Sequence, residues 1–234
     1  MSSPAETALV SAWEERYGAW AEDLLRDGLE TALLQPLAQH PAAALCVARH
    51  VAHWDNHLQR KLAATIVGLV GTAAPADMLD ALLDAEVVRR GRSSELFEQL
   101  TNHSVVEDIV FAATRWCRAA ARREAGLGVL RRVVERTLDG EYWNTASYAV
   151  MGLVHHDAPE AGALFERFAS FAHAGEGERA PERAFVEHLA QGNSTIIEDQ
   201  LVGAEREAAT IAWSDDARAA IGELVALAGA VAVA

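Results

Sequence analysis

A short signature that occurs twice places the strongest constraint on how this chain folds. Gly68-Leu69-Val70 is followed, after three further residues, by Ala74-Pro75, and Gly152-Leu153-Val154 is followed in the same way by Ala158-Pro159. Each copy lies between two apolar stretches with helical spacing. The copies start 84 residues apart (68 to 152), which is twice the roughly 42-residue length of common two-helix repeats. The spacing predicts a helix–turn–helix unit that the chain uses more than once.

The rest of the chain also has the periodicity of helices. In the first stretch, apolar residues recur every three or four positions, at Leu9, Trp13, Tyr17, Trp20 and Leu24. Alternation with period two never lasts beyond a few residues, so no β-strand is predicted. We therefore predict an all-α fold in which helices pair antiparallel through short loops.

Glycine, proline and helix-capping residues divide the rest of the chain into further predicted helices. The predicted helices cover residues 30–39, 42–56, 58–71, 75–90, 94–101, 105–122, 125–138, 142–155, 159–172, 181–191, 195–212 and 215–231. Residues 102–104 are interpreted as a turn, with Ser104 and Glu107 spaced as a capping box. Gly126-Leu127-Gly128 is interpreted as a loop at a helix entry. Residues 173–181 are small, charged and without large apolar side chains, which is typical of a linker.

The twice-used segment resembles HEAT repeats and the wider armadillo-like α-solenoids. In those families a first helix ends in a small-residue turn and a second helix opens near an acid or Pro, as residues 63–71 with 75–88 and residues 148–155 with 159–171 do here. The resemblance implies antiparallel helix pairs stacked as a HEAT-like α-solenoid over residues 1–172. A linker at 173–181 and a C-terminal helical cap at 182–234 would follow. It also implies a concave face that binds another protein.

Charge is unevenly distributed along the chain. The net charge is −14, yet residues 89–136 hold 10 basic and 6 acidic residues. Within this segment Arg115, Arg118 and Arg122 are spaced to share one helix face. One interpretation is a solvated face that balances acids within the fold. The other is a surface between Arg89 and Arg136 on which an acidic segment of a partner, or of a second copy of this chain, docks.

Nucleic acid is disfavoured as a partner because the acidic chain as a whole repels phosphate. A DNA glycosylase on a similar helical array, with Asp139 as its carboxylate, remains a third option that the net charge opposes. Trp143 and Asn144, with Tyr148 one turn on, begin the second copy of the signature. An exposed aromatic residue beside an amide at that place suits contact with a ligand or peptide.

A histidine cluster gives the alternative function. His50, His53 and His57 recur at helical spacing, with Asp55 among them. Imidazoles one turn apart can chelate a transition metal, and a nearby carboxylate can add or orient a ligand. His155-His156-Asp157, at the second signature, is a candidate to complete such a site from another helix. Without a metal, these residues are ordinary helix-surface and turn histidines, and no cofactor is required.

No catalytic motif stands out. Gly-x-Ser-x-Gly, a phosphate loop and a dinucleotide fingerprint are all missing from the sequence. Cys46 and Cys117 are 71 residues apart in apolar stretches, which favours two buried thiols in a reducing compartment. No secretory signal or membrane span is predicted, so we expect a cytoplasmic protein. The sequence thus predicts a non-enzymatic protein-binding scaffold, with a metal- or small-ligand-binding enzyme or sensor as the alternative.

Overall fold

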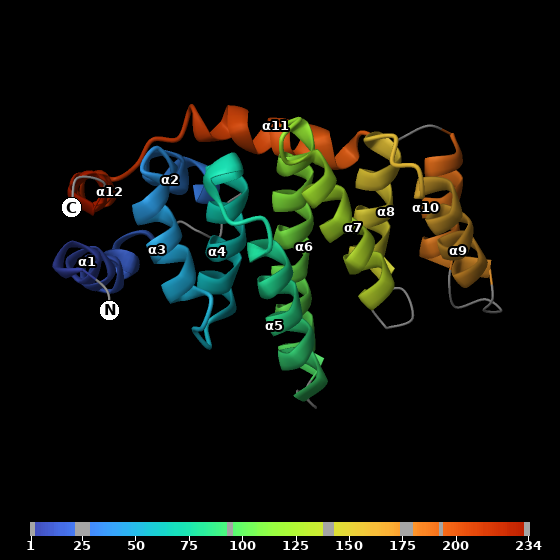
Figure 1. Ribbon diagram of the computed structural model, residues 1–234, viewed down its shortest axis with the longest axis horizontal. Coiled ribbons are helices and arrows are strands. Elements are labelled where there is room, and N and C mark those ends of the chain that lie inside the picture. The colour runs from blue at the N-terminus through green and yellow to red at the C-terminus, as the bar shows by residue number, and fades with distance from the viewer. Residues whose placement is uncertain are drawn as a thin grey trace. The chain divides into compact units, whose positions relative to one another are not determined.

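The computed structural model describes residues 3–21, 29–92, 96–137, 143–173, 180–191 and 194–231. Within these ranges the ordered elements are all helices, without a β-strand, so the all-α prediction is confirmed. Figure 1 labels the α-helices. They are α1 (Pro4–Ala21), α2 (Leu29–Ala38), α3 (Pro41–Val51), α4 (His57–Val70), α5 (Met78–Arg92), α6 (Leu96–Arg118), α7 (Arg123–Thr137), α8 (Trp143–His155), α9 (Ala161–His173), α10 (Ala180–Ala190), α11 (Ile196–Ala208) and α12 (Asp215–Val231), with a 3₁₀ turn η2 (Gly71–Ala73) after α4.

The chain forms two compact units. The first joins Met1–Pro75 with Leu201–Ala234, and the second is Ala76–Gln200. The predicted array over residues 1–172 therefore has members in both units. The predicted linker contains residues 174–179, which lie outside the described residues.

In the first unit, the last helix packs on the first three. α12 contacts α1, α2 and α3, while α4 packs against α2 and α3. Leu9 and Trp13 of α1 and Leu224 of α12 are all buried. Segments from the two ends of the chain thus build one core, which local sequence patterns do not reveal.

In the second unit, the helices pack in chain order from α5 to α10. Each contacts the next, and α5–α7, α6–α8 and α8–α10 also touch. Gly126 of α7 lies at the α6–α7 crossing, where a Cβ atom would come within 2.6 Å of the carbonyl oxygen of Ala113. The interpretation of Gly126-Leu127-Gly128 as a loop is therefore wrong: these glycines lie inside α7, and Gly126 permits the close crossing.

The two copies of the repeated signature both end a helix and lead into the next one, but their turns differ. α4 ends at Val70 and continues into the 3₁₀ turn η2, whereas α8 continues to His155, one residue further along the signature. The residue with positive φ is Gly71 (61°) in the first copy and Asp157 (48°) in the second, at different positions of the signature. The positions of the copies in the fold differ, because the first lies at the boundary between the units and the second lies inside one.

Two predicted helix boundaries are corrected by the structure. The helix predicted over 42–56 ends at Val51, and Asn56 caps α4 by accepting a hydrogen bond from the Leu58 amide at 2.9 Å. The helices predicted over 94–101 and 105–122 are one helix, α6, so the turn at 102–104 is wrong. None of the described helices combines the length and hydropathy that crossing a membrane requires.

Candidate metal centre

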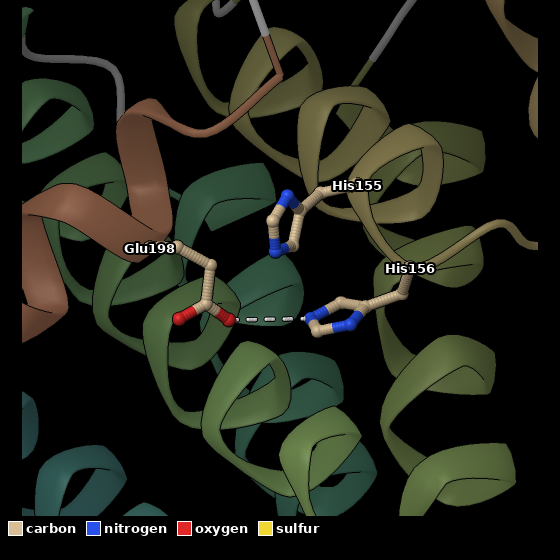
Figure 2. A group of neighbouring side chains, drawn as sticks. All are labelled: His155, His156 and Glu198. Carbon is tan, nitrogen blue, oxygen red and sulfur yellow. Dashed lines mark ion pairs between the residues drawn. The ribbon is translucent and has the colours of Figure 1, made fainter.

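Three potential metal ligands converge inside the second unit. His155 and His156 lie at the C-terminal end of α8, and Glu198 lies in the first turn of α11. One ligand atom from each lies within 4.8 Å of the other two. Figure 2 shows both imidazoles and the carboxylate turned toward the same small volume. It is the one such group of three or more His, Cys, Asp or Glu side chains in the described ranges.

The end of α8 fixes where the two imidazoles lie. The Ala158 amide donates to the Leu153 carbonyl at 3.0 Å and the Asp157 amide donates to the Val154 carbonyl at 3.1 Å. These two bonds, with Asp157 in the left-handed region, form a Schellman motif. The motif holds the backbone of His155 and His156 at the last turn, beside the start of α11.

Two of the potential ligand atoms, His156 Nε2 and Glu198 Oε1, lack hydrogen-bond partners. His156 Nε2 is 3.4 Å from Glu198 Oε1, and the side chains are only 12% and 15% exposed. Neither atom has a hydrogen-bond partner, and both are shielded from solvent. Polar atoms buried in this way lose the free energy of hydration without regaining it. A cation between them would satisfy both.

The other carboxylate oxygen of Glu198 is already bound. Arg118 donates to Glu198 Oε2 from Nε at 2.8 Å and from Nη2 at 2.6 Å. This two-point contact orients the carboxylate so that Oε1 faces His156. Arg123 also donates to the backbone carbonyl of His156, which places a second guanidinium near the group.

His156 is kept in the neutral form that a metal ligand needs. Burial lowers its pKa below the ordinary 6.5, and His155 lowers it further. Glu198 raises this pKa, whereas Arg123 and Arg118 lower it. The net shift is downward, so protons compete for Nε2 only at a lower pH than for a solvated histidine.

The spacing of the His156–Glu198 pair suits a tetrahedral ion. Two ligands about 2.0–2.1 Å from Zn²⁺ in tetrahedral geometry are about 3.4 Å apart, which matches the 3.4 Å between Nε2 and Oε1. A nitrogen of His155 lies within 4.8 Å of both atoms and is the third potential ligand. Imidazole and carboxylate ligands suit Zn²⁺, Fe²⁺, Ni²⁺ and similar ions, and three protein ligands leave a coordination position open.

The sequence indicated part of this group. The sequence predicts His155 and His156 only as an addition to the upstream cluster, and it does not point to Glu198. Glu198 lies on a separate helix, and an acidic residue in the first turn of a helix is ordinary. No spacing rule connects it to α8, and only the contacts of Glu198 with Arg118 and His156 reveal the pairing.

The upstream cluster is arranged differently from the prediction. His50 belongs to α3, His53 and Asp55 lie in the connection, and His57 begins α4, so the four do not share a helix face. His50 Nε2 lies 2.8 Å from Glu14 Oε1 and 3.2 Å from the indole nitrogen of Trp54. The four are described residues, but the structure does not gather them as it does the His155 group.

The predicted arginine face is also divided. α6 ends at Arg118, so Arg122 lies in the turn before α7, where its guanidinium is 5.2 Å from the Trp116 ring centroid. Arg118 is bound to Glu198, and Arg115 is half-buried.

Several other arginines of the segment pair with acids of the same unit. These pairs are Arg89–Glu86, Arg131–Glu160, Arg132–Asp80 and Arg136–Asp84. The arrangement matches the interpretation of the segment as one that balances acids within the fold.

The aromatic candidates are placed only in part. The side chains of Trp143 and Asn144 lie outside the described residues, although their backbone begins α8. Tyr148 is half-buried, with its ring centroid 6.3 Å from that of Phe111. Burial and Glu107 raise the pKa of Tyr148, while a hydrogen bond with Gln200 of α11 lowers it.

The cysteines do not resemble activated nucleophiles. Cys46 and Cys117 are both free thiols. Burial raises the pKa of Cys117 to about 12 and also raises that of Cys46. Thiolate-based chemistry requires a shift in the opposite direction.

Comparison with known proteins identifies no relative. No family model matches the chain, and neither the curated proteins nor the solved structures include a significant match.

Proposed function

We propose that this protein binds a transition-metal ion, Zn²⁺ or one of similar ligand preference, through His155, His156 and Glu198. The observation that carries the proposal is the pair of buried atoms, His156 Nε2 and Glu198 Oε1, which face each other at 3.4 Å without hydrogen-bond partners. The nearby His155 nitrogen supplies a third ligand. This replaces the upstream histidines as the metal site.

The surroundings favour an exchangeable ion over a permanent one. Arg118 and Arg123 place positive charge beside the group, which opposes a cation, and Arg118 occupies one oxygen of Glu198. Three protein ligands also bind less firmly than the closed four-ligand sets of structural zinc sites. We therefore propose a metal-responsive protein rather than one that requires metal to fold.

Metal titration tests the proposal. We expect metal-free protein to bind one equivalent of Zn²⁺ by calorimetry, and Co²⁺ to give the absorption bands of a low-coordinate site. His156→Ala should lower the affinity at least about tenfold, because outer-sphere changes alone cost about 10–100-fold. His173→Ala is the matched control, since His173 is exposed at the end of α9 in the same unit. Equal affinity in wild type and His156→Ala would contradict the proposal.

A protein-binding scaffold is the second candidate, and the chain-order packing of α5 to α10 supports it. We propose that these helices form a solenoid-like array whose partner inserts an apolar side chain beside α9. A pocket of about 430 Å³ there is lined by Val154, Ala161, Phe165 and Leu189 among others. The internal pairing of the arginines makes this pocket a better contact for the partner than the segment from Arg89 to Arg136.

Crosslinking in native extract, followed by mass spectrometry, tests the scaffold. A partner should crosslink near α9, and Phe165→Asp should remove it while Glu166→Lys, at an exposed neighbour, should not. Recovery of the same proteins with Phe165→Asp as with wild type would count against this candidate. A homo-oligomer would appear in the same experiment as crosslinks between copies of the chain.

A further inference from the structure

We infer that the metal ion at His155, His156 and Glu198 controls how firmly the first turn of α11 is held against α8. This inference rests on the proposed metal binding and adds what the binding regulates. The two histidines come from α8 and the carboxylate from α11, so one ion would bridge two elements that the chain does not connect directly.

The start of α11 has few other attachments. α11 forms no extensively packed pair with another helix in the described part of the chain. Its first turn is held by the buried side chain of Ile197, by Glu198 and by the hydrogen bond between Gln200 and Tyr148 of α8. Because these contacts are few, a bond between Glu198 and a metal ion would make the first turn of α11 considerably more stable.

Without metal, the polar attachment at Glu198 is incomplete. Arg118 binds Oε2, but its side chain is 31% exposed, and partly exposed ion pairs are weak and screened by salt. The other oxygen, Oε1, faces His156 Nε2 at 3.4 Å and accepts no hydrogen bond. A bound ion would attract Oε1 and both imidazoles at once.

The size of the effect follows from linkage. An opening motion that pulls Glu198 off the ion removes one of its three ligands, so its equilibrium falls by at most the factor 1 + [metal]/Kd, reached when the open state does not hold the ion. At a free metal concentration ten times Kd, this opening becomes up to about elevenfold rarer. Motions elsewhere in the unit that leave the three ligands together are not affected.

The location of the bridge gives it a regulatory role. α11 begins in the Ala76–Gln200 unit and continues past Leu201, into the sequence of the other unit. The first turn of α11 would then become more stable as the concentration of free metal rises.

Hydrogen exchange measured on the full chain tests this. Metal-free protein and protein at ten times the measured Kd of Zn²⁺ are compared, following the amides of Asp199 to Leu201. Asp199 is the informative start, because its amide donates to the Thr195 carbonyl at 2.8 Å. We expect exchange there to slow by up to about elevenfold, with no change in α9. His156→Ala should lose the slowing.

The outcomes separate this inference from the proposed function. If Zn²⁺ binds by calorimetry but exchange at 199–201 does not change, the metal does not bridge to α11 and the inference is wrong while the metal site remains. If Zn²⁺ does not bind, both fail. The wild-type comparison with and without metal needs no variant, so it decides the question even where a variant misfolds.

Arg118→Met gives a further check on the same motion. It removes the salt-dependent hold on Glu198, so exchange at 199–201 in the metal-free protein should become faster. The affinity for Zn²⁺ should also change in this variant, because Arg118 orients the carboxylate of Glu198. Unchanged exchange at 199–201 in metal-free Arg118→Met would contradict a role for this ion pair in holding the first turn of α11.

Discussion

Two glycines two positions apart in α7 have opposite roles. A Cβ atom at Gly126 would meet the Ala113 carbonyl oxygen at 2.6 Å and the Cys117 sulfur at 2.7 Å, whereas at Gly128 the nearest atom is a flexible Arg132 nitrogen at 3.5 Å. We expect Gly126→Ala to lower the free energy of unfolding by about 1–3 kcal/mol through overpacking. Gly128→Ala should raise it by up to about 1 kcal/mol through helix propensity. Urea denaturation of both variants measures this, and shifts of the same sign would contradict the α6–α7 crossing.

The buried thiol of Cys117 predicts instability in alkali. Its pKa is raised to about 12 from an ordinary 9.0, so its contribution to stability is complete below pH 9 and is lost as pH rises toward 12. In that window the free energy of unfolding should fall by about 1.4 kcal/mol per pH unit from this group alone. Cys117→Ala should show a shallower pH dependence than wild type in urea titrations. Identical slopes would show that the thiol is not buried.

At the scale of the helix, the end of α8 depends on one left-handed residue. Asp157 has φ of 48° and is exposed, a conformation that glycine adopts at no steric cost. We expect Asp157→Gly to raise the free energy of unfolding by up to about 1 kcal/mol, and Asp157→Val to lower it by about 1–2 kcal/mol. Thermal denaturation measures this, and the melting temperature of Asp157→Gly should be higher than that of Asp157→Val. A Val variant as stable as the Gly variant would contradict the Schellman motif.

Most helices were predictable because each carries its own periodic apolar stripe and its own end signals. The errors occurred where a local signal was weak compared with packing. Residues 102–104 continue α6, because intrinsic helix propensities differ by less than about 0.7 kcal/mol per ordinary residue and the flanking helix outweighs them. The break after Val51 was missed because the cap is formed by Asn56, which lies beyond a short irregular stretch.

For the whole molecule, the first unit depends on α12. Leu224 is 3% exposed on the helix that packs on α1, so Leu224→Asp buries a charge at a cost of roughly 3 kcal/mol or more. We expect faster hydrogen exchange in α1 and α3 and little change in α6 and α7, which belong to the other unit. Ala226→Asp, at an exposed position of the same helix, is the control. Equal acceleration in α6 and α7 would show that the units unfold together.

Of the candidate site, the sequence predicts only the two ligands that are adjacent in the chain. The adjacent residues His155 and His156 are candidate ligands from the sequence alone. Glu198 joins them only because α11 starts close to the end of α8. Sequence spacing reports which side chains share a helix face, but it carries no information on which helices meet. The same limit affected the arginines, whose pairing with Asp80, Asp84 and Glu160 depends on contacts between helices.

The joining of α12 to α1, α2 and α3 has a consequence for synthesis on the ribosome. The first 75 residues emerge long before residues 201–234, with all of Ala76–Gln200 translated in between. At about 5–20 residues per second, that delay is on the order of ten seconds. During this time α1, α2 and α3 lack the helix that packs on them, and the nascent chain presents an apolar surface of the kind that chaperones recognise.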